Sequence, residues 1–308
     1  MLYRFHAIDA LKGLCSMKKS ALRKAVKNKN IVITGGSSGI GESTAYLLAE
    51  AGAHVILIAR SVDKLEAVQA KITAFAGKAS IYSCDLTDMD AIVETAQQIL
   101  KEHKHVDILV NNAGRSIRRS VNESLDRFHD FERTMSINYF GAVKLVLEFI
   151  PGMMKRKKGQ IINISSIGVL ANTPRFSAYV ASKAALDAFS RCVAAEVKGK
   201  KIHLTSIYMP LVRTPMIAPT KMYNYMPALS PQEAANLVAK AIIEKPVSIS
   251  SNMGRFASAT YSLVPKFNLG IQSLGYRIFP DFKAAKQKNA KPNVLQRAFA
   301  RILPGEPH

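Results

Sequence analysis

The sequence of 308 residues has few cysteines, few acidic residues and no long apolar run. Its three cysteines, Cys15, Cys84 and Cys192, form no CxxC pair. An odd number without pairs argues against a disulfide framework and a zinc cage, and it favours a reducing compartment. No stretch reaches the roughly 18 consecutive apolar residues of a membrane-spanning helix. We therefore expect a cytoplasmic protein that holds no metal ion.

The composition is that of an ordinary globular protein, with 48% hydrophobic and 21% charged residues. Such values exclude a disordered, collagen-like or coiled-coil chain. At roughly 150 residues per domain the length allows two domains, although α/β folds of up to about 250 residues often form one. One large domain with extensions therefore fits the length as well as two domains.

The 43 Lys and Arg residues outnumber the 22 Asp and Glu residues, and the excess gathers at the two ends of the chain. Residues 1–30 carry eight basic side chains and one acid, and residues 251–308 carry nine basic side chains and two acids. Basic ends suit an anionic partner such as ligand phosphates, a lipid surface or nucleic acid. They are equally compatible with a solvated surface that aids solubility.

Both ends also carry apolar residues. Residues 1–29 show near-helical spacing of Phe5, Ile8, Leu11, Cys15, Leu22 and Val26 among basic residues. This predicts a basic amphipathic extension that lies on a membrane interface or packs on the domain. A mitochondrial transit peptide has a similar composition, whereas the apolar core of a secretory signal is missing. Residues 256–265 and 267–276 are uncharged apolar stretches on either side of Lys266, which predicts a surface-seeking extension over residues 251–308.

Between the ends, short β-branched runs alternate with longer helical periods. The runs cover residues 31–34, 54–59, 79–82, 106–110, 160–165 and 202–208. Each run is continuously apolar, as expected of strands buried on both faces of a parallel sheet. The alternation predicts an α/β fold with a doubly wound parallel sheet of the Rossmann type, in one domain over residues 30–250.

The first motif lies between a predicted strand and a predicted helix, where Thr34 to Gly41 read T-G-G-S-S-G-I-G. Gly35, Gly39 and Gly41 permit a tight turn and let a pyrophosphate approach the positive end of the helix. The strand, turn and helix together predict a dinucleotide-binding site.

Three further motifs follow in order. They are N-N-A-G at 111–114, S-I-N-Y-F-G around Asn138, and Ser166 followed by Y-V-A-S-K from Tyr179 to Lys183. With the TGxxxGxG spacing of the first motif, they make residues 30–250 resemble the short-chain dehydrogenase/reductase family. The resemblance implies an NAD(P)-dependent oxidoreductase with Asn138, Ser166, Tyr179 and Lys183 as catalytic tetrad, assembled as a dimer or tetramer.

The residues themselves support this chemistry. Tyr179 and Lys183 are four positions apart, which places both on one face of a helix. A nearby ammonium favours phenolate, so we expect a lowered pKa for Tyr179. Ser166 would donate a hydrogen bond to the substrate oxygen, and the family's spacing of serine and tyrosine selects it over Ser165. By resemblance, Asn138 interrupts its helix and holds a water that supplies protons to Lys183.

The second predicted strand ends in Ile58-Ala59-Arg60-Ser61, without the acid that binds the ribose of NAD. Arg60 is therefore predicted to bind the 2′-phosphate of NADP(H). The sequence departs from the family at Leu211, where glycine usually follows the proline, and a side chain restricts the backbone there. The resemblance implies these further cofactor contacts: Gly35, Ser37, Ser38, Gly39, Ile40, Gly41, Asp85, Asn111, Ala113, Gly114, Tyr179, Lys183, Pro210, Val212 and Thr214.

Two features bear on the substrate. Arg115, Arg118 and Arg119 directly follow N-N-A-G, at the end of a central strand, and arginines there suit phosphates, including those of coenzyme A. The loop from Met209 to Met226 is rich in methionine and could wrap an alkyl chain. A solvated arginine cluster and an ordinary apolar loop explain the same residues equally well.

A closer resemblance covers residues 111–147, 159–192 and 205–227 and the ending at 300–306. These stretches resemble the bacterial fatty acyl-CoA reductases of wax-ester synthesis. That implies reduction of a long-chain acyl-CoA by NADPH, in which hydride attacks the thioester carbonyl, an aldehyde forms and CoA leaves. The implied substrate contacts are Arg115, Arg118, Arg119, Ser166, Met216 and Tyr223.

Two other functions fit the sequence. One is an NADP-dependent reductase of an apolar ketone or alcohol, using the same tetrad. The other is a membrane-binding or nucleic-acid-binding protein whose Rossmann domain only senses NADPH. The intact tetrad argues against this third interpretation, so we expect no nucleic-acid partner. We do expect peripheral association with an anionic membrane, because both ends are basic and apolar.

Overall fold

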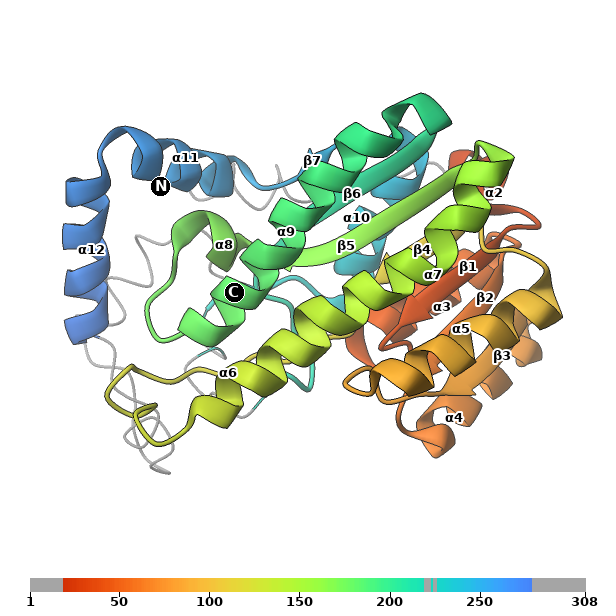
Figure 1. Cartoon of the computed structure of the whole chain (residues 1–308), viewed down its shortest axis with the longest axis horizontal. Helices are drawn as coiled ribbons and strands as arrows, with labels where there is room; N and C mark the ends of the chain where they lie inside the picture. The colour runs from red at the N-terminus through yellow and green to blue at the C-terminus, as the bar shows by residue number, and fades with distance from the viewer. Residues whose placement is uncertain (1–18, 219–222, 224–225, 279–308) are drawn as a thin grey trace.

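Seven parallel strands form the centre of the molecule, in the order β3-β2-β1-β4-β5-β6-β7. The computed structural model describes residues 19–218, 223 and 226–278 (Figure 1). The strands are β1 (Asn30–Thr34), β2 (His54–Ala59), β3 (Lys78–Ser83), β4 (Ile108–Asn111), β5 (Gly159–Ser166), β6 (Ile202–Met209) and β7 (Ser248–Ile249). The strand order reverses between β1 and β4, so the predicted doubly wound sheet is confirmed.

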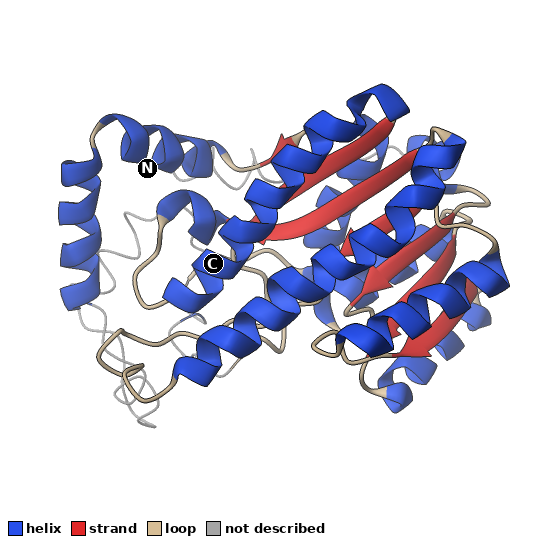
Figure 2. Ribbon diagram, in the orientation of Figure 1, coloured by secondary structure: helices blue, strands red, loops and turns tan. Residues whose placement is uncertain are grey.

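Helices cover both faces of this sheet, as Figure 2 shows. Successive side chains of a strand point to opposite faces, so Ile31 and Ile33 lie in one hydrophobic cluster and Val32 in the other. The first cluster is covered by α2 (Lys19–Val26), α3 (Gly39–Glu50), α4 (Val62–Ala74) and α10 (Pro231–Glu244). The second is covered by α5 (Met89–His103), α7 (Gly141–Arg156) and α9 (Ser177–Val197).

Helix α2 belongs to the folded domain. Its Leu22 and Val26 are almost completely buried in the first cluster. The amphipathic pattern expected over residues 1–29 therefore serves for packing between residues 19 and 26. The domain boundary predicted at residue 30 comes after this helix, although the helix packs on the domain. Residues 1–18 lie outside the described residues.

One continuous helical run combines α6 (Phe128–Met135), the π-helix η1 (Ser136–Phe140) and α7. Within the described part of the chain, only this run, Phe128–Arg156, is long and apolar enough to span a bilayer by composition. Its apolar residues Leu145, Phe149 and Met153 are buried against the sheet. Their burial identifies a core helix. A buried core helix meets the same criteria of length and apolar composition as a membrane-spanning helix.

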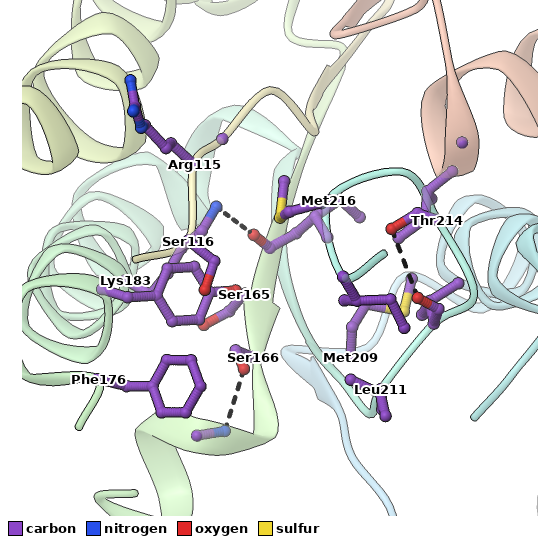
Figure 3. Close-up of a pocket in the computed structure, with 18 of the residues that line it drawn as sticks. Arg115, Ser116, Ser165, Ser166, Phe176, Lys183, Met209, Leu211, Thr214 and Met216 are labelled. Atoms are coloured by element: carbon purple, nitrogen blue, oxygen red, sulfur yellow. Dashed lines mark hydrogen bonds between the residues drawn. The ribbon is translucent and has the colours of Figure 1, made fainter. Parts of the chain in front are cut away.

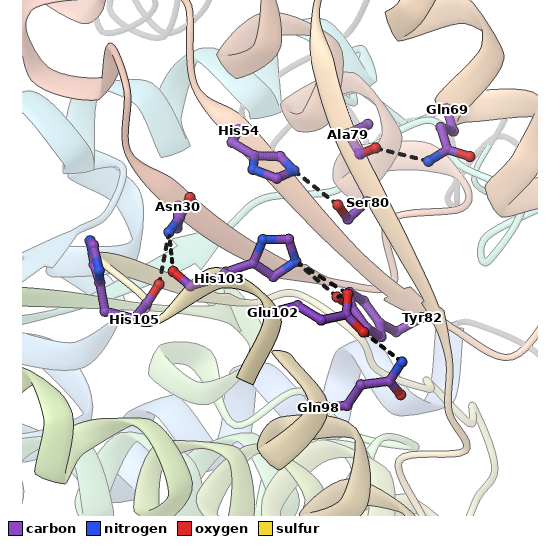
Figure 4. Close-up of polar contacts among 10 residues, drawn as sticks. All are labelled: Asn30, His54, Gln69, Ala79, Ser80, Tyr82, Gln98, Glu102, His103 and His105. Carbon is purple, nitrogen blue, oxygen red and sulfur yellow. Dashed lines mark hydrogen bonds and ion pairs between the residues drawn. The ribbon is translucent and has the colours of Figure 1, made fainter. Parts of the chain in front are cut away.

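Polar side chains of the first strands form a paired network with the end of α5 (Figure 4). Asn30 donates from Nδ2 to the carbonyl oxygens of His103 and His105, at 3.1 and 2.9 Å. Tyr82 donates its hydroxyl hydrogen to Glu102 at 2.6 Å and lies 2.8 Å from Nε2 of His103. These bonds join the start of β1 and the second half of β3 to the end of α5.

Beyond β7 the chain forms α11 (Asn252–Leu263) and α12 (Pro265–Ile278), at the end of the molecule toward which the strands point (Figure 1). The start of α11 packs on the short helix α8 (Ile167–Ala171), where Gly254 lies against Leu170 and Ile167. Helix α12 has no buried residue and is tied to the domain through Gln272, which donates to the carbonyl of Ala171. The apolar stretches predicted as a surface extension are therefore two helices beside α8.

Candidate active site

A cleft of about 580 Å³ opens at the carboxyl ends of β1, β4, β5 and β6 (Figure 3). In open α/β sheets, ligands bind at this edge, where the strand order reverses. The cleft gathers predicted residues from the glycine turn, the N-N-A-G turn, the serine and tyrosine motifs and the loop after β6, which are Gly35, Ser38, Gly39, Ile40, Ala113, Gly114, Ser166, Tyr179, Lys183, Pro210, Val212 and Thr214. Five other predicted cofactor residues lie outside its lining, as does Asn138: Ser37, Gly41, Arg60, Asp85 and Asn111.

The glycine turn forms a cradle at the start of α3. Gly35 and Gly39 have φ angles of +65° and +58°, which residues with side chains rarely adopt. A Cβ on Gly41 would lie 2.2 Å from the carbonyl oxygen of Gly35, so only glycine fits there. Ser38, at the N-cap, makes no side-chain hydrogen bond to the helix. The first backbone N–H groups of α3 therefore face the cleft uncapped, which fits a pyrophosphate.

Thr34 ties the first two motifs together. Its hydroxyl accepts hydrogen bonds from the backbone N–H of Asn112 and of Ala113, both at 2.9 Å. Asn112 in turn donates from Nδ2 to the carbonyl of Thr34 at 2.9 Å. Asn111 points away from the cleft, where it is buried and donates to Asn163 Oδ1 at 2.8 Å. Asn111 thus supports the floor of the site from behind.

The helix interruption predicted at Asn138 is present as the π-helix η1. Asn138 is fully buried, accepts from the backbone N–H of Arg115 at 2.8 Å, and donates to the carbonyl of Arg115 at 2.9 Å. A Cβ on Gly114 would lie 2.9 Å from Asn138 Oδ1 and 3.3 Å from Lys183 Nζ. The missing side chain at Gly114 therefore lets these two residues approach the N-N-A-G turn.

Lys183 and Tyr179 project from α9 into the cleft, and Ser166 lies at the end of β5. Lys183 is buried and donates from Nζ to the carbonyl of Ile164 at 2.8 Å. Burial lowers the pKa of Lys183 to about 8. Burial raises the pKa of Tyr179, and its hydrogen bond with Ser166 opposes this rise.

The expected lowering of the Tyr179 pKa is therefore wrong for the protein without ligand. Desolvation of the phenol outweighs the stabilisation of phenolate, since burial disfavours the charged form. Of the two adjacent serines, Ser165 is buried, with a hydroxyl that has no hydrogen-bond partner in the described part of the chain. Ser166 is more open and accepts from the backbone N–H of Gly168 at 3.1 Å.

Arg60 and Asp85 lie together beside the cleft, at the ends of β2 and β3. Arg60 Nη1 is 3.9 Å from Asp85 Oδ2, and the two side chains are 71% and 44% exposed. An exposed pair at this distance is weak, so Arg60 can reorient toward an arriving anion. Arg60 can therefore make the predicted contact with a 2′-phosphate.

The loop after β6 holds its shape without the family's glycine. Leu211 has no positive φ angle, so its side chain causes no backbone strain. Its carbonyl accepts from the backbone N–H of Leu229, and the N–H of Arg213 donates to the carbonyl of Leu229, both at 2.8 Å. Thr214 Cγ2 lies beside Gly39, which brings this loop against the glycine turn.

The predicted substrate residues have different surroundings. Arg115 is exposed and Arg118 is buried, and both line the cleft. Arg119 lies there too, but its Nε is 3.2 Å from Asp130 Oδ2, so its charge is partly compensated. Met216 is 48% exposed at the cleft, and burial raises the pKa of Tyr223 to about 12.

Several residues of the site escaped the sequence analysis. Arg213 donates to the carbonyls of Tyr223 and Met226, at 2.7 and 2.6 Å, and so holds these two residues beside the cleft. Phe176 and Val180, around the start of α9, also line the cleft. Phe176 lies between the motifs at Ser166 and Tyr179, in a segment without a polar motif, whereas Val180 stands inside the Y-V-A-S-K motif, of which only Tyr179 and Lys183 were assigned to the site.

The model of the short chain dehydrogenase family matches residues 29–223. The chain belongs to the short-chain dehydrogenase family. A solved neighbour, a metagenomic short-chain oxidoreductase in complex with NADP, has 29% identity and a TM-score of 0.64, covering 73% of this chain and 97% of its own.

This short-chain dehydrogenase also has curated relatives with named activities. It is 61% identical to a fatty acyl-CoA reductase of Acinetobacter baylyi, over 94% of this chain and 98% of that protein. It is 45% identical to a fatty acyl-CoA reductase of Mycobacterium tuberculosis, over 78% of this chain and 82% of that protein.

Proposed function

We propose that this short-chain dehydrogenase reduces a long-chain fatty acyl-CoA to the fatty aldehyde with NADPH and releases CoA. The observation that carries the proposal is the 61% identity, over nearly the whole of both chains, with the Acinetobacter fatty acyl-CoA reductase. The cleft supports it, since it carries the cations Arg115 and Arg118 as well as apolar residues from the loop after β6. An acyl-CoA has both kinds of surface.

The residues present fit the cofactor. The uncapped start of α3 and the Gly41 cradle would hold the pyrophosphate, and Arg60 would bind the 2′-phosphate. Thr214, beside Gly39, would meet the carboxamide of the nicotinamide. When bound, NADPH supplies the hydride.

The chain's own residues would handle the charge and the proton. Ser166 and Tyr179 present hydroxyl groups to the carbonyl oxygen of the thioester, where negative charge develops. The raised pKa of Tyr179 keeps the phenol protonated at neutral pH, which suits a donor. Lys183 is an ammonium below about pH 8 and adds positive charge. Collapse of the tetrahedral adduct then breaks the C–S bond and releases the CoA thiolate.

The test is to incubate the purified protein with NADPH and palmitoyl-CoA and to assay aldehyde and free thiol. Both products should appear in step with NADPH oxidation. Turnover of an apolar ketone without any release of thiol from palmitoyl-CoA would favour the ketone reductase instead. Absence of turnover with every carbonyl substrate would leave only the NADPH-sensing interpretation.

We also propose that α11 and α12 bind an anionic lipid surface, on which long acyl-CoAs gather. Five large apolar side chains on and between these helices are at least half exposed: Phe256, Leu263, Phe267, Leu269 and Leu274. Residues 251–278 contain three basic residues and no acid. Each basic side chain near an anionic bilayer contributes about 1 kcal/mol, and apolar helix faces add to this. The proposal rests on these helices, because Leu22 and Val26 of α2 are packed in the core.

Flotation with phosphatidylserine vesicles tests this docking. The full chain should float at low salt, and substitution of both Lys266 and Arg277 by Glu should abolish flotation without affecting the fold, because α12 has no buried residue. Failure of the full chain to bind at low salt would contradict the proposal. A concentration-dependent dimer that masks Phe267 and Leu269 would show that a second copy covers these helices instead.

A homo-oligomeric state and a cytoplasmic location are proposed as well. Phe140 and Leu147 are 51% and 55% exposed on the continuous helix of η1 and α7, and such apolar side chains suit a contact between subunits. Sedimentation of the protein and of a Leu147→Glu variant would test the oligomer. Fractionation of cells would test the location.

A further inference from the structure

A second cavity of about 400 Å³ adjoins the cleft. It lies between the loop after β4, the segment that joins α8 to α9, and the end of α12. Arg119, Thr173 and Val180 line both cavities, so a ligand can extend from one into the other. The motifs that identify the family contribute one residue, Val180, to the lining of this second cavity.

The lining of the second cavity includes two arginines and several side chains that can donate hydrogen bonds. It contains Arg119, Arg175, Ser120, Asn122, Asn172, Thr173, Ser177 and Tyr276 together with three apolar residues, and no Asp or Glu. The lining of the cleft has no carboxylate either. Ser120 is 98% buried, and its hydroxyl has no hydrogen-bond partner within the described part of the chain. A buried polar group of this kind costs stability unless a ligand satisfies it.

The two arginines are held in place. The backbone N–H of Arg119 donates to the carbonyl of Arg175 at 2.7 Å. The Arg175 guanidinium lies 4.0 Å from the ring centroid of Tyr276 and donates to the Tyr276 carbonyl at 3.0 Å. Asp130 is shared between Arg119 and Arg127, at 3.2 and 2.9 Å, so one carboxylate faces two guanidinium groups. These contacts fix the positions of the two guanidinium groups before a ligand arrives.

We propose that the second cavity binds the phosphorylated nucleotide end of coenzyme A while the thioester lies beside Tyr179. This rests on the proposed function. An acyl-CoA has a polyanionic nucleotide, a neutral pantetheine arm and a thioester in that order, and its length requires a second site beyond the reacting atoms. Cations without carboxylates recognise the phosphates. Arg60, predicted to bind the cofactor phosphate, follows β2, on the other side of β1 from β4 and β5, so the two phosphate sites are separate.

Two charge substitutions test the subsite without touching the catalytic residues. Ser177 is exposed at the first position of α9, so Ser177→Asp adds a negative charge that the helix N-terminus tolerates. Asn122 is exposed on the loop, and Asn122→Asp adds the same charge from the opposite wall. Lys101→Gln, on the exposed surface of α5, is the matched control, because it makes the net charge more negative by the same amount away from the cavity.

The expected result is a difference between two thioesters. Each Asp variant should raise the KM for palmitoyl-CoA at least about tenfold, because like charge opposes the phosphates. The kcat/KM for palmitoyl-pantetheine, which has no nucleotide, should stay at the wild-type value. The KM for NADPH should not change, and Lys101→Gln should behave as wild type. Equal losses with both thioesters, or no loss with either, would overturn the subsite.

A binding measurement keeps the subsite separate from the activity. Adenosine 3′,5′-bisphosphate should bind wild type in calorimetry with saturating NADP⁺, which blocks the cofactor site, and binding should weaken in the Asp variants. If neither thioester is turned over, the proposed function fails while this titration still decides on the subsite. No heat of binding to the wild type would reject it.

Discussion

The polar groups around the end of α5 and those beside the cleft differ in their hydrogen bonding. Around the end of α5, Asn30, His54 and Tyr82 all bond to neighbouring protein groups. At the carboxyl ends, the side chains of Ser120 and Ser165 are buried and, among the described residues, have no hydrogen-bond partner. Paired groups add stability, whereas unpaired buried groups cost it unless a ligand pairs with them. The difference indicates, independently of any motif, that ligands bind at the carboxyl ends of the strands.

The largest expected effect comes from removing one hydroxyl at the carboxyl end. Tyr179→Phe should lower kcat by about 100-fold to 10,000-fold, as expected when a positioned acid is lost. The dissociation constant of NADPH should not change, because the lost group acts on the substrate oxygen. Single-turnover kinetics and a fluorescence titration of NADPH would measure both. A near-normal kcat in this variant would rule out the family's mechanism for this chain.

The sequence predicted the parts of the site that depend on local patterns. Continuous apolar runs locate the first six strands, and β7 lies in the short run that follows Pro246. The glycine spacing predicted the cradle at Gly41, and the resemblance to the family implied the interruption at Asn138 that appears as a π-helix. These features are local because turn geometry and strand burial are encoded within a few residues.

Features that depend on burial or on distant segments could not be predicted in this way. The pKa of Tyr179 rises because the folded chain desolvates it, and its neighbours in sequence do not reveal this. The second cavity needs Arg119, Arg175 and Tyr276, which lie far apart in the chain. Likewise, Leu22 and Val26 carry the same amphipathic pattern whether they face lipid or the core. Only the folded structure distinguishes these cases.

The next effect concerns the cofactor side of the same end. Arg60→Gln should raise the KM for NADPH about fivefold to tenfold and leave the KM for NADH nearly unchanged. The loss is limited because Arg60 is 71% exposed, and solvent screens its interaction with a phosphate. Lys64→Gln, on the exposed side of α4, is the matched control. Equal changes for both cofactors would mean that Arg60 does not bind the 2′-phosphate.

A smaller effect is expected from pH. The pKa of Lys183 is lowered to about 8, so its ammonium is present below that pH and is lost above it. The value of kcat/KM for the acyl thioester should therefore be level near pH 7 and fall as pH rises beyond about 8. Initial rates between pH 6.5 and 9.5 would reveal the break. A profile that stays level up to about pH 9.5 would show that the charge on Lys183 does not enter the rate.

The smallest effect is expected for the same substitution in the polar network around the end of α5. Tyr82→Phe removes a hydroxyl that donates to Glu102 at 2.6 Å, but Glu102 is 47% exposed and water can replace this partner. We expect Tm to fall by about 2 °C, as for a modest loss in a domain of this size, and kcat to stay at the wild-type value. Tyr82 in the network and Tyr179 in the cleft thus lose the same atom, one with a cost in stability and the other in rate. A large loss of turnover in Tyr82→Phe, with the Tm unchanged, would break the division between the two regions, because it would mean that the paired network also serves the site.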